Sequence, residues 1–275
     1  MSYNTILVHV DASRHAEARI ALAVRLAAEH GAHLVGAAMT GVSRFMFHGA
    51  NVDLARTVLA DQLDVLVGHA NVALARFEAL AGAVDGLSFE PRLVDDDAAG
   101  GLALQAHYAD LVVLSQFDPA DPVARTDPDL PAYVMLNSAA PLLMVPTIGA
   151  AANAGSHALV AWDESLQASR AVANAVPLLR RAAGVTLALF QPEVAGRLAG
   201  ADIALYLARH GVNVVVRREE TAADVGGALL SLASDVGADL LVMGGYGHAR
   251  WREVLLGGVT QTVLKSMTIP VLMSH

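Results

Sequence analysis

The chain of 275 residues contains no cysteine, which excludes disulfides, thiolate metal sites and cysteine nucleophiles. Charged residues make up only 16% of the sequence and aromatic residues only 5%. Hydrophobic residues make up 55%, which excludes a disordered chain and is enough for the cores of two ordinary domains. Ala, Val, Leu and Gly dominate, a composition typical of α/β layers whose buried parallel strands are continuous aliphatic runs.

Positive charge is also in short supply, because 18 Lys and Arg stand against 27 Asp and Glu and leave a net charge of −9. Duplex binding needs a basic stripe that displaces counterions, so we expect no nucleic acid partner. Asp, His or Arg interrupts every apolar run before it reaches membrane-spanning length. Residues 1–5 lead straight into a strand without a basic region and an apolar signal core. We therefore expect no membrane partner and a cytoplasmic protein.

Several catalytic signatures are missing as well. The sequence holds no G-x-x-x-x-G-K-[ST] loop, no G-x-S-x-G elbow and no H-E-x-x-H pair, so nothing supports a Walker site, a serine hydrolase or a zinc protease. The acidic run 95–97 precedes an expected helix, where carboxylates complement the helix dipole. We interpret that run as a cap region and not as a metal cluster.

The sequence repeats itself. Residues 6–13 correspond to 158–165 at an offset of 152, and each segment ends in Asp-x-Ser. Residues 109–114 correspond to 238–243, and 141–144 to 270–273, at an offset of 129. The first half therefore carries about two dozen extra residues in its middle, where the periodicity of residues 52–83 predicts one elongated helix.

Each half alternates short aliphatic strands with amphipathic helices, which predicts an α/β fold of two tandem, doubly wound, parallel five-stranded sheets of the Rossmann-like type. The predicted strands are 5–10, 33–39, 88–94, 110–115 and 141–145, then 157–162, 185–190, 212–217, 239–243 and 270–273. The small and polar segment 147–156 is the expected linker between domains 1–146 and 157–275. The final strands of the two halves would be sheet edges, which favours pairing them with each other or with a second chain.

A glycine pattern near the C-terminus suggests a ligand. The predicted strand 239–243 runs into a loop with Gly244 and Gly247, and after nine further residues Gly257 precedes a predicted helix. Glycines let backbone N–H groups approach an anion, and a helix N-terminus favours negative charge. Alternatively, the glycines only shape a turn. Because ligands of open parallel sheets bind beyond the carboxyl ends of strands, Asp163 and Gly244 should face one site.

This pattern, with the repeat, resembles the universal stress protein family, whose ATP-binding members carry G-x-x-G, nine residues and then G-[ST]. The resemblance covers almost the whole chain as a tandem pair and implies an adenine nucleotide α-hydrolase-like fold packed as an intrachain pseudo-dimer. Gly244, Gly247 and Gly257 fit the pattern, whereas Gly258 stands where the family has Ser or Thr. One hydroxyl donor to a phosphate is therefore lost, and Thr260 partly compensates for it.

The resemblance also implies which residues contact the nucleotide. The expected adenine pocket and the expected ribose and phosphate contacts comprise Ala161, Trp162, Asp163, Glu164, Phe190, Met243, Gly244, Gly247, His248, Gly257, Gly258, Val259 and Thr260. Two alternatives stay open: Asp163 could be a helix N-cap, and Trp162 could either cover the base or fill the cavity. The basic residues His248, Arg250, Arg252 and Lys265 suit a polyphosphate or, equally, a solvated helix face.

The first half lacks this loop. Ser115, Asp118, Pro128 and Asp129 stand where the second half has Gly244, Gly247, Gly257 and Gly258. Proline removes a donor N–H, and carboxylates repel phosphates, so we expect no ATP binding by the first half. Asp11, the counterpart of Asp163, is interpreted as a cap or as part of a remnant pocket.

Together these features predict a stress-response or regulatory protein that binds ATP, or ADP or AMP, possibly with Mg²⁺, in its C-terminal domain and acts as a nucleotide-dependent switch. ATP hydrolysis would at most be slow, because no convincing general base accompanies the loop. The alternative is a nucleotide-free interaction or dimerisation module with both pockets closed. An unidentified protein partner and a homodimer are further expectations.

Overall fold

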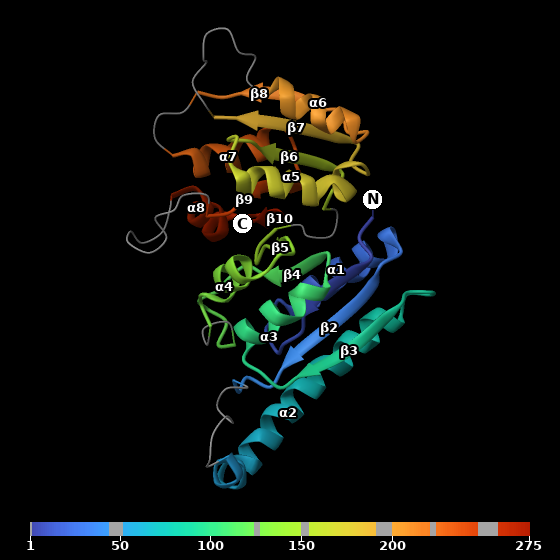
Figure 1. Cartoon of the computed structure of the whole chain (residues 1–275), viewed down its shortest axis with the longest axis vertical. Coiled ribbons are helices and arrows are strands. Elements are labelled where there is room, and N and C mark those ends of the chain that lie inside the picture. Colours follow the sequence, from blue (N-terminus) through green and yellow to red (C-terminus); the bar gives the residue numbers. More distant parts are fainter. Residues whose placement is uncertain are drawn as a thin grey trace. The chain divides into compact units, whose positions relative to one another are not determined.

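The computed structural model describes residues 2–43, 52–123, 127–149, 154–190, 200–220, 224–246 and 258–275, with the backbone alone for 52–63. The chain divides into two compact units, Ser2–Ala140 and Pro141–His275 (Figure 1). We call them the N-terminal and C-terminal units and describe each by itself. The first domain was predicted to end at residue 146, whereas the N-terminal unit ends at Ala140. The strand in residues 142–145 therefore falls in the C-terminal unit.

In the N-terminal unit, four parallel strands lie in the order β3-β2-β1-β4. The elements follow the chain as β1 (Thr5–His9), α1 (Ala16–His30), β2 (His33–Met39), α2 (Val52–Gly82), β3 (Phe89–Val94), α3 (Ala98–Gln105) with a short 3₁₀ turn (Ala106–Tyr108), β4 (Leu111–Ser115) and α4 (Leu130–Asn137). The central strands β1 and β4 are buried almost throughout. This burial explains why they are unbroken aliphatic runs.

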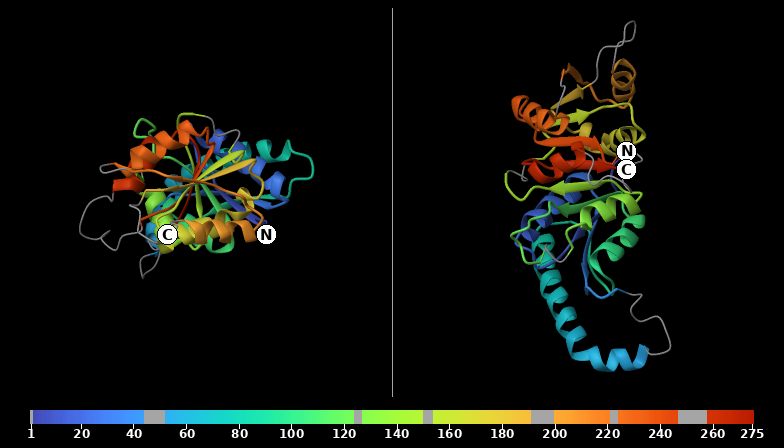
Figure 2. Two further views of the ribbon diagram at one scale, coloured as in Figure 1. Left: turned by 90° about the horizontal axis from the view of Figure 1, so that it is seen from above. Right: turned by 90° about the vertical axis from the view of Figure 1, so that its left-hand side faces the viewer.

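In the C-terminal unit, the strand order is β5-β10-β9-β6-β7-β8. The elements are β5 (Leu142–Val145), β6 (His157–Ala161), α5 (Leu166–Leu179), β7 (Gly184–Leu189), α6 (Ala201–Arg209), β8 (Val215–Arg218), α7 (Val225–Asp235), β9 (Leu240–Gly244), α8 (Gly258–Ser266) and β10 (Val271–Ser274). Within this unit α5 and α6 cover one face of the sheet, and α7 and α8 cover the other (Figure 2). The predicted α/β, doubly wound class is confirmed.

The strands that end the two halves pair with each other. β5 and β10 run antiparallel, with Leu143 opposite Leu272 at the centre of the ladder. The predicted pairing of the two final strands is confirmed. The predicted count of five strands per sheet differs from the structure, because β5 joins the strands of the C-terminal unit. Among the described residues, the units as divided therefore hold four and six strands.

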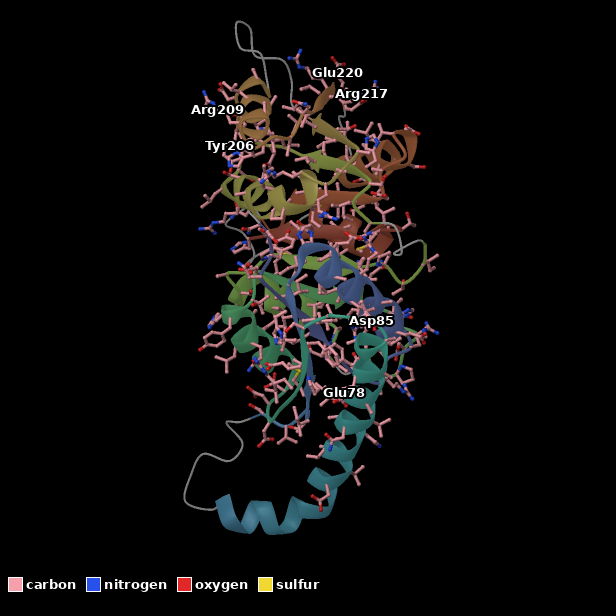
Figure 3. The ribbon with its side chains drawn as sticks, turned by 90° about the vertical axis from the view of Figure 1, so that its right-hand side faces the viewer. Glu78, Asp85, Tyr206, Arg209, Arg217 and Glu220 are labelled. Atoms are coloured by element: carbon pink, nitrogen blue, oxygen red, sulfur yellow. The ribbon has the colours of Figure 1, made fainter. Side chains whose placement is uncertain are left out.

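The predicted elongated helix is confirmed as α2. Its C-terminal part packs on β2 through Phe77, which is fully buried. Gly36 makes this contact possible, since a Cβ there would lie 2.5 Å from the Phe77 ring. Glu78 and, beyond the helix, Asp85 are exposed (Figure 3). One side of this part of α2 thus meets the sheet while the other meets solvent.

Charged residues mark two further places in the fold. Asp97 is the N-cap of α3 and accepts a hydrogen bond of 2.8 Å from the Gly100 N–H, which confirms the cap interpretation of the acidic run. β8 is an edge strand whose residues are all exposed, and Arg217 and Glu220 lie at its end (Figure 3). Charges on an edge strand discourage pairing with another strand.

Candidate functional site

Three strand ends meet in the C-terminal unit. β6 lies between β9 and β7, with Val160 opposite Val242 and Ala161 opposite Ala188. The chain leaves β6 toward β7 and leaves β9 toward β10, on the other side, so the strand order reverses between β6 and β9. Such a reversal creates a crevice at the carboxyl ends of the strands. We call the residues at this edge and at the start of α8 the strand-end site.

The turn after β6 is built by two side chains. The Asp163 Oδ1 accepts a hydrogen bond of 3.0 Å from the Ser165 N–H, and the Ser165 hydroxyl accepts one of 3.1 Å from the Ala168 N–H. Ser165 is therefore the N-cap of α5. Asp163 is exposed and shapes the turn. Of the two readings left open for Asp163, the N-cap reading is wrong, because Ser165 occupies that position.

Two aromatic residues follow the neighbouring strands. Trp162, directly after β6, is half-buried, and its backbone N–H donates a 3.0 Å hydrogen bond to the Ala188 carbonyl. Phe190, directly after β7, is also half-buried. Trp162 and Phe190 thus lie at the same carboxyl edge of the sheet as Asp163. That edge is where a planar base would need apolar surface.

Gly244 ends β9 and lies against the start of α5. A Cβ there would lie 2.6 Å from the Ala168 nitrogen and 2.9 Å from the Gln167 carbonyl carbon. Both contacts are with backbone, which cannot rotate away, so close packing alone requires glycine here. The glycine prediction thus has a structural explanation at this position, independent of any phosphate. Met243, the preceding residue, is buried.

The start of α8 faces the end of β9. The buried Thr260 hydroxyl accepts a 3.2 Å hydrogen bond from the Tyr246 N–H, which joins the two elements. Gly258, the first residue of α8, is exposed, and a Cβ there would meet nothing within 4 Å. Val259, between them, is half-buried. The first N–H groups of a helix lack intrahelical partners, so this end of α8 is suited to an anion.

Lys265 lies in the last turn of α8. It is seven residues from Gly258, and a helix rises about 1.5 Å per residue, so the two ends are separated by about 10 Å. The interpretation of Lys265 as a phosphate partner therefore stays a prediction, with the residue at the opposite end of α8 from Gly258. Gly247, His248, Arg250, Arg252 and Gly257 lie outside the described residues.

Backbone strain gathers at the strand-end site. Among the described residues, Glu164 (φ 63°) and Tyr246 (φ 53°) are the non-glycine residues with positive φ. One follows β6 and the other follows β9. Left-handed backbone costs a side-chain-bearing residue about 1–2 kcal/mol and is often kept at functional sites. Both strained residues therefore belong to the strand-end site.

The equivalent edge of the N-terminal unit is built differently. Arg19 on α1 is 1% exposed, and its guanidinium donates to the His9 carbonyl, the Ser115 hydroxyl and the Asp11 carboxylate at 2.7, 2.8 and 2.8 Å. Burial acts to raise the pKa of Asp11, but Arg19, His9 and the Ser13 hydroxyl hold that pKa well below its ordinary range. The cap of α1 is His15. Asp11 does not cap this helix but lines a cavity, in agreement with its interpretation as part of a remnant pocket.

The loop after β4 uses carboxylates where the other unit has glycines. Asp118 is bound by the His15 ring, the Arg14 guanidinium and the Ala120 N–H, and these bonds lower its pKa. Asp121 accepts hydrogen bonds from the backbone N–H groups of Arg14 and Val123. The Ala120 and Val123 N–H groups of this loop thus donate to carboxylates. A phosphate site needs such backbone donors to be available.

His9 gives the N-terminal unit a pH-dependent stability. Burial, with a smaller contribution from Arg19, outweighs Asp11 and lowers the pKa of His9 from 6.5 to about 4. As the pH falls from 6.5 to 4, the unfolded chain takes up a proton before the folded chain does, so stability is present above pH 6.5 and is lost below it. The shift corresponds to about 3 kcal/mol. Urea unfolding followed by circular dichroism should show this loss, His9→Gln should remove it, and the exposed His107→Gln should keep it.

Arg19 and His9 were missed by the sequence reasoning. The signal was a histidine inside an aliphatic strand and an arginine among the apolar positions of α1. At the offset of 152, their counterparts are Ala161 and Ala171. A comparison of the two repeats could therefore have shown that His9 and Arg19 accompany the Asp-x-Ser turn of the first half only.

Within the described ranges, no three His, Asp or Glu side chains come together as metal ligands. None of the helices described there is both long enough and apolar enough to span a membrane.

Comparisons with known proteins concern the fold and the sequence family. Residues 156–275 match the model of the Universal stress protein family. A universal stress protein of Methanocaldococcus jannaschii is 41% identical over 44 residues, which span 16% of this chain and about a quarter (27%) of that protein. The crystal structure of a universal stress protein from Archaeoglobus fulgidus has the same fold, with a TM-score of 0.74 and 14% identity over 98% of this chain and 95% of that one.

A putative universal stress protein from Pseudomonas aeruginosa has a TM-score of 0.56 and 17% identity over 98% of this chain and 92% of its own. Shorter solved universal stress proteins include a complex with cAMP and, from Archaeoglobus fulgidus, a complex with dAMP. They cover 54% and 52% of this chain and 99% and 98% of their own, at 21% and 15% identity, with TM-scores of 0.38 and 0.35. The match to the Universal stress protein family model thus covers residues 156–275, which lie in the C-terminal unit.

Proposed function

We propose that the C-terminal unit binds an adenine nucleotide, with ATP as the main ligand, at the strand-end site. Ala161, Trp162, Asp163, Glu164 and Phe190 would line the adenine pocket. Met243, Gly244, Gly247 and His248 would follow the ribose and phosphates, and Gly257, Gly258, Val259 and Thr260 would hold the terminal phosphate, with Mg²⁺ as a possible companion.

The observation that carries the proposal is the meeting of three features at one edge. The ends of β6 and β9 are adjacent, the start of α8 is tied to the end of β9 through Thr260, and the family's glycine spacing joins the two. A helix N-terminus beside a glycine loop is a ready anion site. The Thr260 hydroxyl accepts from Tyr246, so its own hydrogen can be donated to a phosphate oxygen.

Backbone strain at Glu164 and Tyr246 supports the same proposal. The two residues flank the proposed nucleotide on the β6 and β9 sides. A bound ligand that contacts both turns would offset this strain. Binding would then bias the conformation of the two turns, and this bias is the physical basis of the proposed nucleotide-dependent switch.

The alternative function is a nucleotide-free interaction module. Two observations favour it: Gly244 is required by packing against α5, and Gly258 lacks the hydroxyl that the family carries. The two functions differ in whether the start of α8 contacts a phosphate. A substitution at Gly258 therefore separates them.

Gly258→Ser is expected to tighten ATP binding. The added hydroxyl restores the family's donor, and a hydrogen bond to a charged oxygen contributes about 1.5 kcal/mol, which is about tenfold in Kd. The structure leaves open space for the side chain. Gly258→Ala adds the carbon without the hydroxyl and should leave the Kd unchanged. Equal, measurable affinities of the Ser and Ala variants in calorimetric titration would show that the phosphates do not lie at residue 258, and no ATP binding by either variant would argue for the interaction module.

A further inference from the structure

The N-terminal unit contains a cavity of about 460 Å³ at the carboxyl ends of β1, β2 and β4. β1 lies between β2 and β4, so the cavity occupies the point where the strand order reverses. A volume of this size lies within the range of small-molecule sites. The nucleotide proposal above assigns no ligand to this cavity.

The cavity walls are mainly apolar. They include Met39 from β2, Leu66, Ala70 and Ala73 from α2, and Leu130 at the start of α4. Ala70 and Ala73 are buried on α2, and their small side chains leave room that larger residues would fill. The elongated helix therefore forms one wall of the cavity.

The rim exposes apolar side chains to solvent. Leu66 is 37% exposed, Phe117 is 37% exposed and Val123 is 36% exposed, and all three line this one cavity. Scattered exposed hydrophobic residues are ordinary, but a group of them around a cavity marks a binding surface. A ligand with apolar surface would bury these side chains.

The charges around the cavity disfavour an anion. The Arg19 guanidinium is engaged by Asp11, Ser115 and the His9 carbonyl, and the His15 ring is bound to Asp118. Asp127 also lines the cavity, and burial together with Asp97 and Asp129 raises its pKa, which reports a negative surrounding. An anionic ligand would lose its hydration beside Asp11 and Asp127, because Arg19 and His15 are already paired and the exposed His69 is the basic side chain of the lining that remains.

Polar groups also line the cavity. The hydroxyl groups of Ser13, Thr40 and Ser115 line it, each beside the end of a different strand. Such groups orient a ligand without requiring a charge. We propose that the cavity of the N-terminal unit binds a small, uncharged, mainly apolar molecule with one polar end, a ligand class different from the nucleotide of the C-terminal unit.

The proposal is tested with two fluorescent probes that differ by one charge. N-phenyl-1-naphthylamine is neutral, and 8-anilinonaphthalene-1-sulfonate carries a sulfonate on the same ring system. Titrated into the full chain, the neutral probe should bind saturably at one site per chain, with a blue-shifted emission. The sulfonate should bind at that site at least tenfold more weakly. Equal binding of the two probes, or no saturable binding of the neutral one, would overturn the proposal.

Matched variants locate the site. Ala70→Phe should fill the cavity and weaken the neutral probe at least tenfold, whereas Ala75→Phe on the exposed side of α2 should not. Should Ala70→Phe fail to fold by circular dichroism, Leu66→Asp at the exposed rim gives the same test. Its control is Val65→Asp, which is 55% exposed and does not line the cavity. Unchanged binding in the folded cavity variants would contradict the assignment. ATP titration of the same variants should be unaffected, which separates this test from that of the nucleotide proposal.

Discussion

Replacing Arg19 by Met is expected to destabilise the N-terminal unit by about 3–5 kcal/mol, because the substitution leaves the buried Asp11 carboxylate without its cation. The same change removes the donors to Ser115 and to the His9 carbonyl. Burial would then raise the pKa of Asp11 without the opposing effect of the Arg19 guanidinium. Amide hydrogen exchange of β1 and β4 measures the loss.

The chain supplies controls for this experiment. Arg25→Met on the same helix removes a partly exposed pair with Glu29 and should cost less than about 1 kcal/mol. Asp11→Asn combined with Arg19→Met should recover part of the loss, since no unpaired charge remains. Both tryptophans, 162 and 251, belong to the second half of the sequence, so their fluorescence should report an unchanged transition of the C-terminal unit. A cost below 1 kcal/mol for Arg19→Met would show that the buried network does not hold the unit together.

Gly258→Asp is expected to weaken ATP binding by about 10- to 100-fold while leaving the fold intact. It copies Asp129, the residue at the equivalent position of the first half, and places a carboxylate where a phosphate should lie. Repulsion between close charges is about 1–4 kcal/mol in partly screened surroundings. The same carboxylate stabilises the start of α8, so the melting temperature should stay constant or rise.

Gly258→Asn is the matched control, because it has nearly the same shape and no charge. Calorimetric titration should place its affinity near that of the unchanged chain. If the Asp and Asn variants bind ATP equally well, the phosphates do not lie at the start of α8. If both lose binding together with structure, a third variant, Gly258→Ala, separates the steric effect from the charge effect.

The sequence repeat was sufficient to predict the strands, the elongated α2 and the pairing of the two final strands. Aliphatic runs such as 111–114 and 240–243 are unambiguous because both faces of their sheets are covered. The position of Asp163 and Gly244 on adjacent strands also followed from the pattern, since carboxyl ends of parallel strands lie at one edge.

Tertiary contacts determined what the pattern could not. The reach of Arg19 from α1 to Asp11 and Ser115 depends on how the helix packs on β1 and β4, which no local periodicity encodes. The requirement for glycine at 244 comes from the approach of α5, a neighbour distant in sequence. The cavity of the N-terminal unit likewise depends on small residues of α2 near the strand ends. The absence of a glycine loop predicted only that the first half binds no ATP and could not predict the volume or the lining of this cavity.

Calorimetric titration of the nucleotide-stripped chain with ATP and Mg²⁺, followed by ADP and AMP, tests the central claim most directly. We predict one site per chain, weakened about 10- to 100-fold in Gly258→Asp and unchanged in Ala70→Phe. Two sites per chain would contradict the assignment of nucleotide binding to the C-terminal unit alone. No binding at millimolar ATP would contradict the nucleotide switch and leave the interaction module.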